Sequence, residues 1–292
     1  MTAYLNYDST VIYHEQLTAL DNFVFSTTPS EKAIIDIGAN LTHESFGNDF
    51  EDVINRARQA NISHMIVTGS DIEDSTKAIS LADTNTNLFS ATAGIHPHHA
   101  EQYSDAAKTT LRDLIKLDVV KAVGETGLDF FRDISPRKKQ IESFHAHLEL
   151  AEESGKSLFL HQRDSHDTFL AVLKEHRSRV GQVVVHCFTD TAEALDDYLQ
   201  LDCHIGITGW ICDERRGAHL LDCVGNIPLN RLMIETDAPY LMPRNLRPKP
   251  KTRRNEPCNL PLVLEAVASV RPETSAELAE ATSNNAIRFF SL

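Results

Sequence analysis

The sequence lacks the features of membrane and exported proteins. It contains no run of about 18 consecutive apolar residues, the length that a membrane-spanning helix requires. Residues 1–31 contain neither lysine nor arginine, so the N-terminus resembles neither a secretory signal nor an arginine-rich transit peptide. We therefore expect a cytoplasmic protein that has no membrane partner.

Cysteine is scarce and irregularly spaced. The 292-residue chain has five cysteines, an odd number, and none of them belongs to a Cys-x-x-C pair. Disulfide frameworks are typical of short exported chains, and this chain is long and carries no export signal. The pattern favours reduced and mostly buried thiols.

Positive charge is also in deficit. The chain has 42 acidic and 28 basic residues and a formal charge of −14, whereas proteins that bind nucleic acids usually present a basic surface. One segment is an exception, because residues 244–254 contain six cations and no acid. The prolines in and around this segment favour an extended loop. Its cations are Arg244, Arg247, Lys249, Lys251, Arg253 and Arg254.

Short apolar runs alternate with amphipathic stretches through most of the chain. Val183–Val185 is continuous and β-branched, as expected of a strand that is covered on both faces. Eight strands are predicted at residues 33–37, 63–67, 89–94, 119–123, 157–160, 183–185, 204–207 and 231–234.

The stretches between these strands have helical spacing. A helix is predicted after Asp49, a second after a Ser135 cap with Pro136 in its first turn, and a third capped by Thr189 or Asp190. Eight alternations over about 258 residues match the size of a (β/α)8 TIM barrel, which is about 250 residues. A doubly wound open sheet is the alternative. We predict a barrel over residues 32–292 and an N-terminal extension, residues 1–31, that packs on the barrel or binds a partner.

Ionisable side chains follow five of the predicted strands directly. In a β/α barrel the C-terminal ends of the strands form the floor of the active site, so these groups should converge. Imidazole and carboxylate are ligands for divalent cations, and a water bound to such a cation becomes a nucleophile near neutral pH. The pattern predicts metal-assisted hydrolysis. The groups are His96, Glu125, His161, His186 and the Glu235-Thr236-Asp237 run.

These motifs resemble those of the TatD family of metal-dependent deoxyribonucleases, which belongs to the wider group of amidohydrolase-like barrels. The resemblance covers roughly residue 34 to the C-terminus. Seven motifs carry it in order: Ala93–His98, Gly124–Asp129, Leu160–Asp164, Val185–Thr189, Ile207–Trp210, Ile234–Leu241 and Arg253–Pro257.

The resemblance implies a role for each site residue. Glu125, His161 and His186 match metal ligands of the family, and Asp237 matches an aspartate that binds metal or acts in catalysis. We expect Asp237, or Glu125 while it bridges two metals, to assist proton removal. His96 matches a histidine that lines the site and contacts phosphate. The resemblance implies Mg²⁺ as the metal, whereas the ligand types alone would also allow Mn²⁺ or Zn²⁺.

The first strand departs from the pattern of many relatives. They carry a His-x-His motif that helps to hold a second metal, and here Asn40 and Thr42 occupy those positions. The subgroup that this chain most resembles also has Asn-Leu-Thr there, so activity need not be lost. We expect one well-bound cation on Glu125, His161 and His186, and only weak binding of a second.

Several residues are predicted to bind the substrate. Arg163 could donate charged hydrogen bonds to a phosphate, and Trp210, the only tryptophan, is a candidate stacking surface for an unpaired base. The basic segment follows Asp237, so we expect it on the catalytic face. The remaining candidates are His98, Arg247, Arg253 and Arg254.

The resulting hypothesis is a monomeric 3′→5′ exonuclease that prefers single-stranded DNA, with RNA as an additional substrate, and that acts in DNA repair or degradation. One alternative is an amidohydrolase for small molecules on the same barrel, which would have no use for the basic segment. The other is a non-catalytic binding protein, and the retention of five ionisable groups at strand ends argues against it.

Overall fold

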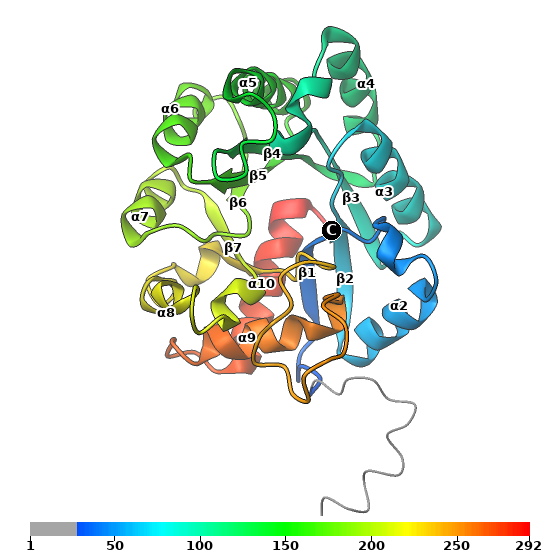
Figure 1. Cartoon of the computed structure of the whole chain (residues 1–292), viewed down its shortest axis with the longest axis vertical. Helices are drawn as coiled ribbons and strands as arrows, with labels where there is room; N and C mark the ends of the chain where they lie inside the picture. Colours follow the sequence, from blue (N-terminus) through cyan, green and yellow to red (C-terminus); the bar gives the residue numbers. More distant parts are fainter. Residues whose placement is uncertain (1–27) are drawn as a thin grey trace, which may run out of the picture.

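The computed structural model describes residues 28–292. The predicted extension, residues 1–31, lies almost wholly outside this range, and its role stays a prediction. Eight parallel strands form one sheet in sequence order, surrounded by helices (Figure 1). The strands are β1 (Ile34–Ala39), β2 (Ile62–Val67), β3 (Phe89–Ala93), β4 (Val120–Asp129), β5 (Ser157–Arg163), β6 (Val183–Val185), β7 (His204–Ile207) and β8 (Leu232–Ile234).

The sheet closes between its first and last strands. Ala39 and Ala238 form a parallel bridge, and the backbone N–H of Asn40 donates to the carbonyl of Ala238 at 2.7 Å. The N–H of Asp237 donates to the carbonyl of Gly38 at 2.8 Å. A doubly wound sheet would leave both edge strands unpaired on one side, so the prediction of a (β/α)8 barrel is confirmed.

Helices connect the strands and cover the outside of the barrel. Their apolar faces pack against the strands, as the spacing of Val53, Ile54 and Ala57 predicts. The helices are α2 (Phe50–Gln59), α3 (Ile72–Thr84), α4 (Asp105–Ile115), α5 (Arg137–Ser154), α6 (His166–His176), α7 (Ala192–Gln200), α8 (Ala218–Val224), α9 (Leu260–Ala268) and α10 (Ser275–Phe290).

Helix α10 closes the N-terminal end of the barrel. Phe289 and Phe290 are buried in one cluster with side chains inside the barrel, such as Ile37 and Phe159. The hydroxyl of Ser157, at the start of β5, donates to the carbonyl of Phe289 at 2.8 Å. The opposite end, at the C-terminal ends of the strands, therefore remains open for a site.

Two of the predicted helix caps were wrong. The hydroxyl of Ser135 donates to the carbonyl of His98 at 2.8 Å instead of capping α5, which begins at Arg137. Helix α7 is capped by Thr191, whose hydroxyl accepts from the N–H of Ala194 at 3.3 Å. A neighbouring hydroxyl therefore replaces the predicted cap of α7, whereas α5 follows Pro136 and has no side-chain cap.

Two expectations from composition can be compared with the described residues. Across residues 28–292 no helix is both long enough and apolar enough to cross a membrane. All five cysteines fall in this range and form no disulfide there. Four of them are buried and Cys187 is partly exposed.

Gly124 allows β4 to pass close to β5. Its φ angle is +140°, and a Cβ added there would lie 2.1 Å from the carbonyl oxygen of Phe159. Only glycine tolerates both the backbone conformation and this approach. Because Glu125 is the next residue, this close approach also sets where its carboxylate lies.

Gly124→Ala is expected to lower the free energy of unfolding by more than about 2 kcal/mol, because it adds a backbone overlap to an unfavourable φ. Gly155→Ala is the matched control, since Gly155 has a φ of +69° and a Cβ added there would meet no atom within 4 Å. It should cost about 1 kcal/mol. Denaturant unfolding measures both, and equal losses would show that the contact with Phe159 is not the constraint.

Candidate active site

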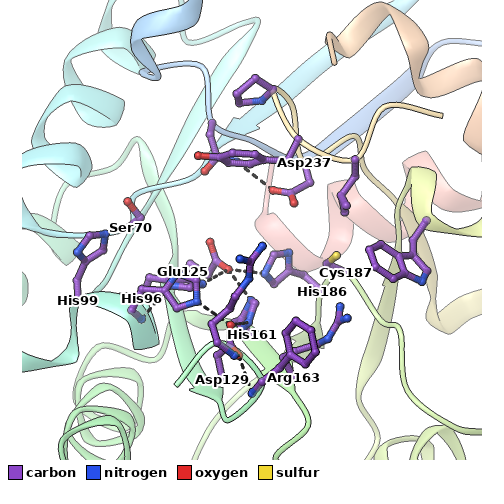
Figure 2. Close-up of a pocket in the computed structure, with 18 of the residues that line it drawn as sticks. Ser70, His96, His99, Glu125, Asp129, His161, Arg163, His186, Cys187 and Asp237 are labelled. Carbon is purple, nitrogen blue, oxygen red and sulfur yellow. Dashed lines mark hydrogen bonds and ion pairs between the residues drawn. The ribbon is translucent and has the colours of Figure 1, made fainter. Parts of the chain in front are cut away.

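A cavity opens at the C-terminal end of the barrel. Its volume of about 690 Å³ is within the usual range for ligand sites. Figure 2 shows its side chains pointing inward from several strands. Among the predicted site residues, those that line it are His96, His98, Glu125, His161, Arg163, His186, Trp210, Asp237 and Arg253.

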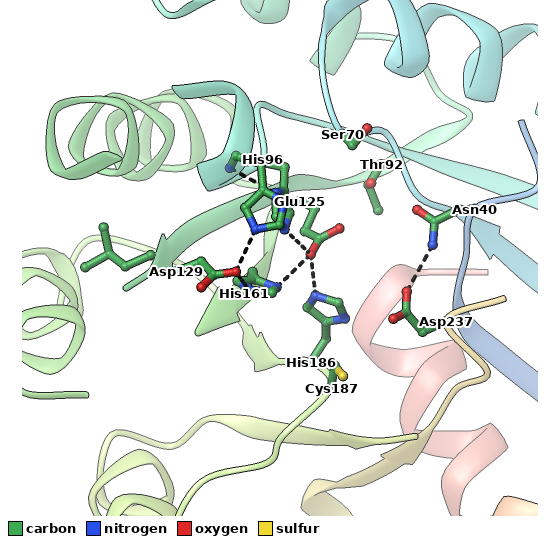
Figure 3. A network of polar contacts seen from close by, with 12 residues as sticks. Asn40, Ser70, Thr92, His96, Glu125, Asp129, His161, His186, Cys187 and Asp237 are labelled. Atoms are coloured by element: carbon green, nitrogen blue, oxygen red, sulfur yellow. Dashed lines mark hydrogen bonds and ion pairs between the residues drawn. The ribbon is translucent and has the colours of Figure 1, made fainter. Parts of the chain in front are cut away.

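Three imidazoles converge on one carboxylate oxygen at the floor of the cavity. Glu125 Oε1 lies 2.8 Å from His186 Nε2, 3.0 Å from His161 Nδ1 and 3.3 Å from His96 Nε2 (Figure 3). β4 continues past Glu125 to Asp129, so Glu125 lies within the strand and not at its end. The register shift between Val123 and Thr126 occurs at this point.

These contacts shift the pKa values of the buried groups. Burial alone would raise the pKa of Glu125, but the neighbouring His96 and His186 bring it well below its usual value. Burial alone would lower the pKa of His186, but the carboxylates of Glu125 and Glu235 raise it well above its usual value. The pKa of His96 falls to about 4, mainly through burial. The group therefore includes a carboxylate anion and a neutral His96.

Glu235 orients His186 and was not assigned a role from the sequence. It is fully buried, its Oε2 lies 3.3 Å from His186 Nδ1, and its Oε1 accepts from the N–H of Cys187 at 2.6 Å. A carboxylate at Nδ1 holds the proton there and leaves the lone pair of Nε2 for a cation. Its place directly after β8, which ends at Ile234, was the available signal, since the site groups gather at the C-terminal ends of the strands.

Asp129 is a second residue that the sequence reasoning missed. Its Oδ2 lies 2.7 Å from His98 Nε2 and 3.6 Å from His161 Nε2. Burial alone would raise the pKa of Asp129, but the neighbouring imidazoles of His161 and His98 lower it well below its usual range. The spacing of four from Glu125 was the available signal, because residues i and i+4 of a strand share a face.

The donor set fits a divalent cation. Ligand atoms of His96, Glu125 and His161 all lie within 4.8 Å of one another. Three imidazoles directed at a single oxygen exceed the two lone pairs that this oxygen offers, and His161 Nε2 is buried without a hydrogen-bond partner. A cation shared by these groups would resolve the crowding. The assignment of ligands to Glu125, His161 and His186 stays a prediction, and the geometry adds His96 to the candidates.

The two residues in place of the first-strand histidines lie differently. Asn40 lines the cavity, and its Nδ2 donates to Asp237 Oδ1 at 3.0 Å. Thr42 is not among the lining residues, because its hydroxyl donates to Asp74 on α3. Burial, with the nearby carboxylates of Glu125 and Glu235, raises the pKa of Asp237 to about 7.

The basic segment contributes one arginine to the cavity. Arg253 is exposed and lines it. Arg254 is instead paired with Asp49 and Glu256, at 2.7 and 2.8 Å. The guanidinium of Arg247 donates to the carbonyls of Arg244 and Leu246, and neither Arg247 nor Arg254 is among the lining residues.

Arginine and aromatic side chains alternate on one wall of the cavity. The guanidinium carbon of Arg163 lies 4.8 Å from the ring centroid of Phe131 and 4.9 Å from that of Trp210. Arg216 lies over Trp210 as well, at 4.3 Å. Phe131 and Arg216 were not predicted to belong to the site, and both line the cavity.

A second histidine cluster lies on the outer helices. His145 Nδ1 and His176 Nε2 are 3.0 Å apart, and His176 Nδ1 contacts Glu152 at 2.6 Å. Neither histidine is among the residues that line the cavity. His147 is buried and accepts the N–H of Ile95 at 2.9 Å, so it supports the segment that leads to His96.

The barrel and its site define a metal-dependent hydrolase. Eight parallel strands place imidazoles and carboxylates on the floor of one cavity, and these groups fit a divalent cation.

Comparison with known proteins gives the family. The profile described as TatD related DNase matches residues 35–291. Proteins named 3′-5′ ssDNA/RNA exonuclease TatD from Edwardsiella piscicida and Erwinia tasmaniensis are 46% and 45% identical over 259 residues, which are 89% of this chain and 100% of each relative. The crystal structure of YjjV, a TatD homologue from Escherichia coli K12, is similar with a TM-score of 0.81 at 30% identity. The matched region is 89% of this chain and 98% of the YjjV chain. The chain belongs to the TatD-related DNase family, and the family and the class of enzyme predicted from the motifs are confirmed.

Glu235→Gln is expected to weaken metal binding about 10- to 100-fold, because an amide cannot hold the proton of His186 at Nδ1 as a carboxylate does. Calorimetric titration with Mn²⁺ measures this affinity. Glu152→Gln is the matched control, since Glu152 makes the same kind of contact to His176 on the outer helices. An unchanged affinity in Glu235→Gln, or an equal loss in both variants, would contradict the orienting role.

Proposed function

We propose that the chain is a metal-dependent 3′→5′ exonuclease that acts on single-stranded DNA, with RNA as an additional substrate. The observation that carries this proposal is the convergence of His96, His161 and His186 on Glu125 beneath a rim of arginines. Relatives named 3′-5′ ssDNA/RNA exonuclease TatD, at 44–46% identity, support the polarity and the substrate.

Glu125, His161 and His186, with His96 beside them, would hold the cation. When bound, the cation lowers the pKa of a water and polarises a phosphodiester oxygen. Mg²⁺ is the proposed ion, with Mn²⁺ or Zn²⁺ as the alternatives that these ligand types allow. A second ion would depend on Asn40, which offers a weak neutral oxygen in place of an imidazole.

Asp237 is suited to accept the proton from the attacking water. Its pKa of about 7 lies near neutrality, where a general base works best. The amide of Asn40 holds one carboxylate oxygen of Asp237 at 3.0 Å, and the other oxygen remains available for this proton. Arg163 and Arg253 line the cavity and would neutralise the charge of the phosphates.

The setting of this activity is also a proposal. A monomer in the cytoplasm that trims strand ends in DNA repair or degradation is consistent with the five free thiols, the formal charge of −14 and a cavity that Arg253 lines.

Single-stranded DNA labelled at its 3′ or 5′ end tests the activity. With Mg²⁺, the 3′ label should leave first as a mononucleotide, and EDTA should stop the reaction. His161→Ala should reduce the rate by about 100-fold or more, because it removes a ligand of the cation that activates the water. A variant as fast as wild type would refute the site, and early release of a 5′ mononucleotide would refute the polarity.

Arg253→Ala is expected to raise the KM for single-stranded DNA several-fold and to leave the hydrolysis of bis(4-nitrophenyl) phosphate unchanged, because only the longer substrate reaches the rim. Arg247→Ala is the matched control from the same segment, since its guanidinium is held by backbone carbonyls outside the cavity. Steady-state kinetics at fixed ionic strength measure both variants. An equal effect of the two changes would mean that the segment acts only through its total charge.

A further inference from the structure

Phe131 is an exposed aromatic side chain at the mouth of the cavity. It lies in the connection between β4 and α5, and 57% of its surface is accessible. Single exposed apolar residues are common on proteins and need no explanation. Phe131 differs from Ile134, which is 60% exposed in the same connection, because only Phe131 lines the cavity.

The ring of Phe131 is supported from within the site. The guanidinium of Arg163 lies 4.8 Å from its centroid, at the distance of a cation–π contact. Arg163 also contacts Thr189 at 3.4 Å through Nη1, so it is held from the other side. The ring is therefore fixed on one side by a cation while more than half of its surface stays open.

Trp210 is less available than Phe131. Two guanidinium groups, those of Arg163 and Arg216, lie within 5 Å of its indole. The indole is only partly exposed, and both cations already contact its ring. We infer that Trp210 holds the two arginines in place, whereas Phe131 presents the free aromatic surface.

One carboxylate links Phe131 to the chemical centre. Asp129 Oδ1 accepts from the N–H of Phe131 at 3.0 Å and from the N–H of Arg132 at 2.7 Å. Its Oδ2 contacts His98 and approaches His161. Because Asp129 is buried, the position of Phe131 is set relative to the imidazoles that surround Glu125.

We propose that Phe131 is the stacking platform for one of the two unpaired bases that flank the scissile phosphodiester, an inference that rests on the proposed nuclease function. Every nucleobase has a π face, so the platform would accept all four bases without reading sequence. A base inside a duplex has both faces covered by its neighbours. Stacking on Phe131 therefore requires an unpaired end and would give the enzyme its preference for single strands.

The test combines a protein change with a substrate change. Phe131→Ala should lower kcat/KM on a single-stranded oligonucleotide by roughly 10-fold or more, because it removes one base–aromatic contact. Phe131→Trp should retain the wild-type value, and Phe131→Leu should not. Oligonucleotides with an abasic site at the last or the penultimate 3′ position remove the base instead. On one of these two abasic oligonucleotides, the kcat/KM of wild type should fall to the value that Phe131→Ala has on the intact strand. The kcat/KM of Phe131→Ala should fall little further on the same abasic oligonucleotide.

Two controls separate stacking from other effects. The affinity for Mn²⁺, measured by calorimetric titration, and the thermal unfolding midpoint should be equal in wild type and Phe131→Ala, which shows that the metal site and the fold are intact. Ile134→Ala removes an equally exposed side chain from the same connection and should leave the oligonucleotide kinetics unchanged.

Two results would overturn the inference. If the kcat/KM of Phe131→Ala is lower than that of wild type by the same factor on both abasic oligonucleotides as on the intact strand, Phe131 does not contact a base. If wild type cleaves oligonucleotides and Phe131→Ala is equally active, the platform is refuted while the nuclease function stands. Failure of wild type to cleave any oligonucleotide would refute the function itself, and this inference with it.

Discussion

The buried carboxylate of Glu125 is the constraint on which the site depends. A charge inside a protein is costly unless partners surround it, and here three imidazoles supply the compensation. His161 belongs to β5, whereas His96 and His186 follow β3 and β6, so the barrel must bring β3, β4, β5 and β6 together before the charge is stabilised. The close passage of β4 and β5 at Gly124 is part of the same requirement, because it places Glu125 beneath the imidazoles.

A second layer of carboxylates organises this centre. Glu235 contacts the imidazole of His186, and Asp129 contacts that of His98. Asp129 also accepts from the backbone N–H of Phe131 in the following loop. The two acids lie on different sides of the centre. Glu235 connects the centre to the interior of the barrel, where Thr236 is held by Asp36, and Asp129 connects the centre to the solvent-facing rim. One network of contacts therefore joins the floor of the cavity to the loop at its mouth.

Sequence patterns predicted the barrel and most of the floor of the site. Parallel strands that are buried on both faces appear in the sequence as apolar runs. Because the C-terminal ends of barrel strands converge, these runs were enough to predict that four residues lie together: His96, Glu125, His161 and His186. Asp129 was not predicted to belong to the site, because the apolar run of β4 ends before Glu125 while the strand continues to Asp129. The pairing of Arg254 with Asp49 was not predicted either, because the two residues are 205 positions apart in the chain. Pairings over such separations are decided by the finished fold and leave no local pattern.

The anchoring of the basic segment has a consequence for how binding responds to salt. Of its six cations, Arg244 is paired with Glu214 and Arg254 with Asp49, so both ends of the segment are tied to acids. Within residues 28–292, the other four form no ion pair with an acidic side chain: Arg247, Lys249, Lys251 and Arg253. Each phosphate that such a cation neutralises on a single strand releases about 0.7 of a counterion. The segment can therefore contribute a slope of about −3 at most to a plot of log affinity against log salt. A steeper slope would require cations outside the segment, such as Arg163 and Arg216, which also line the cavity.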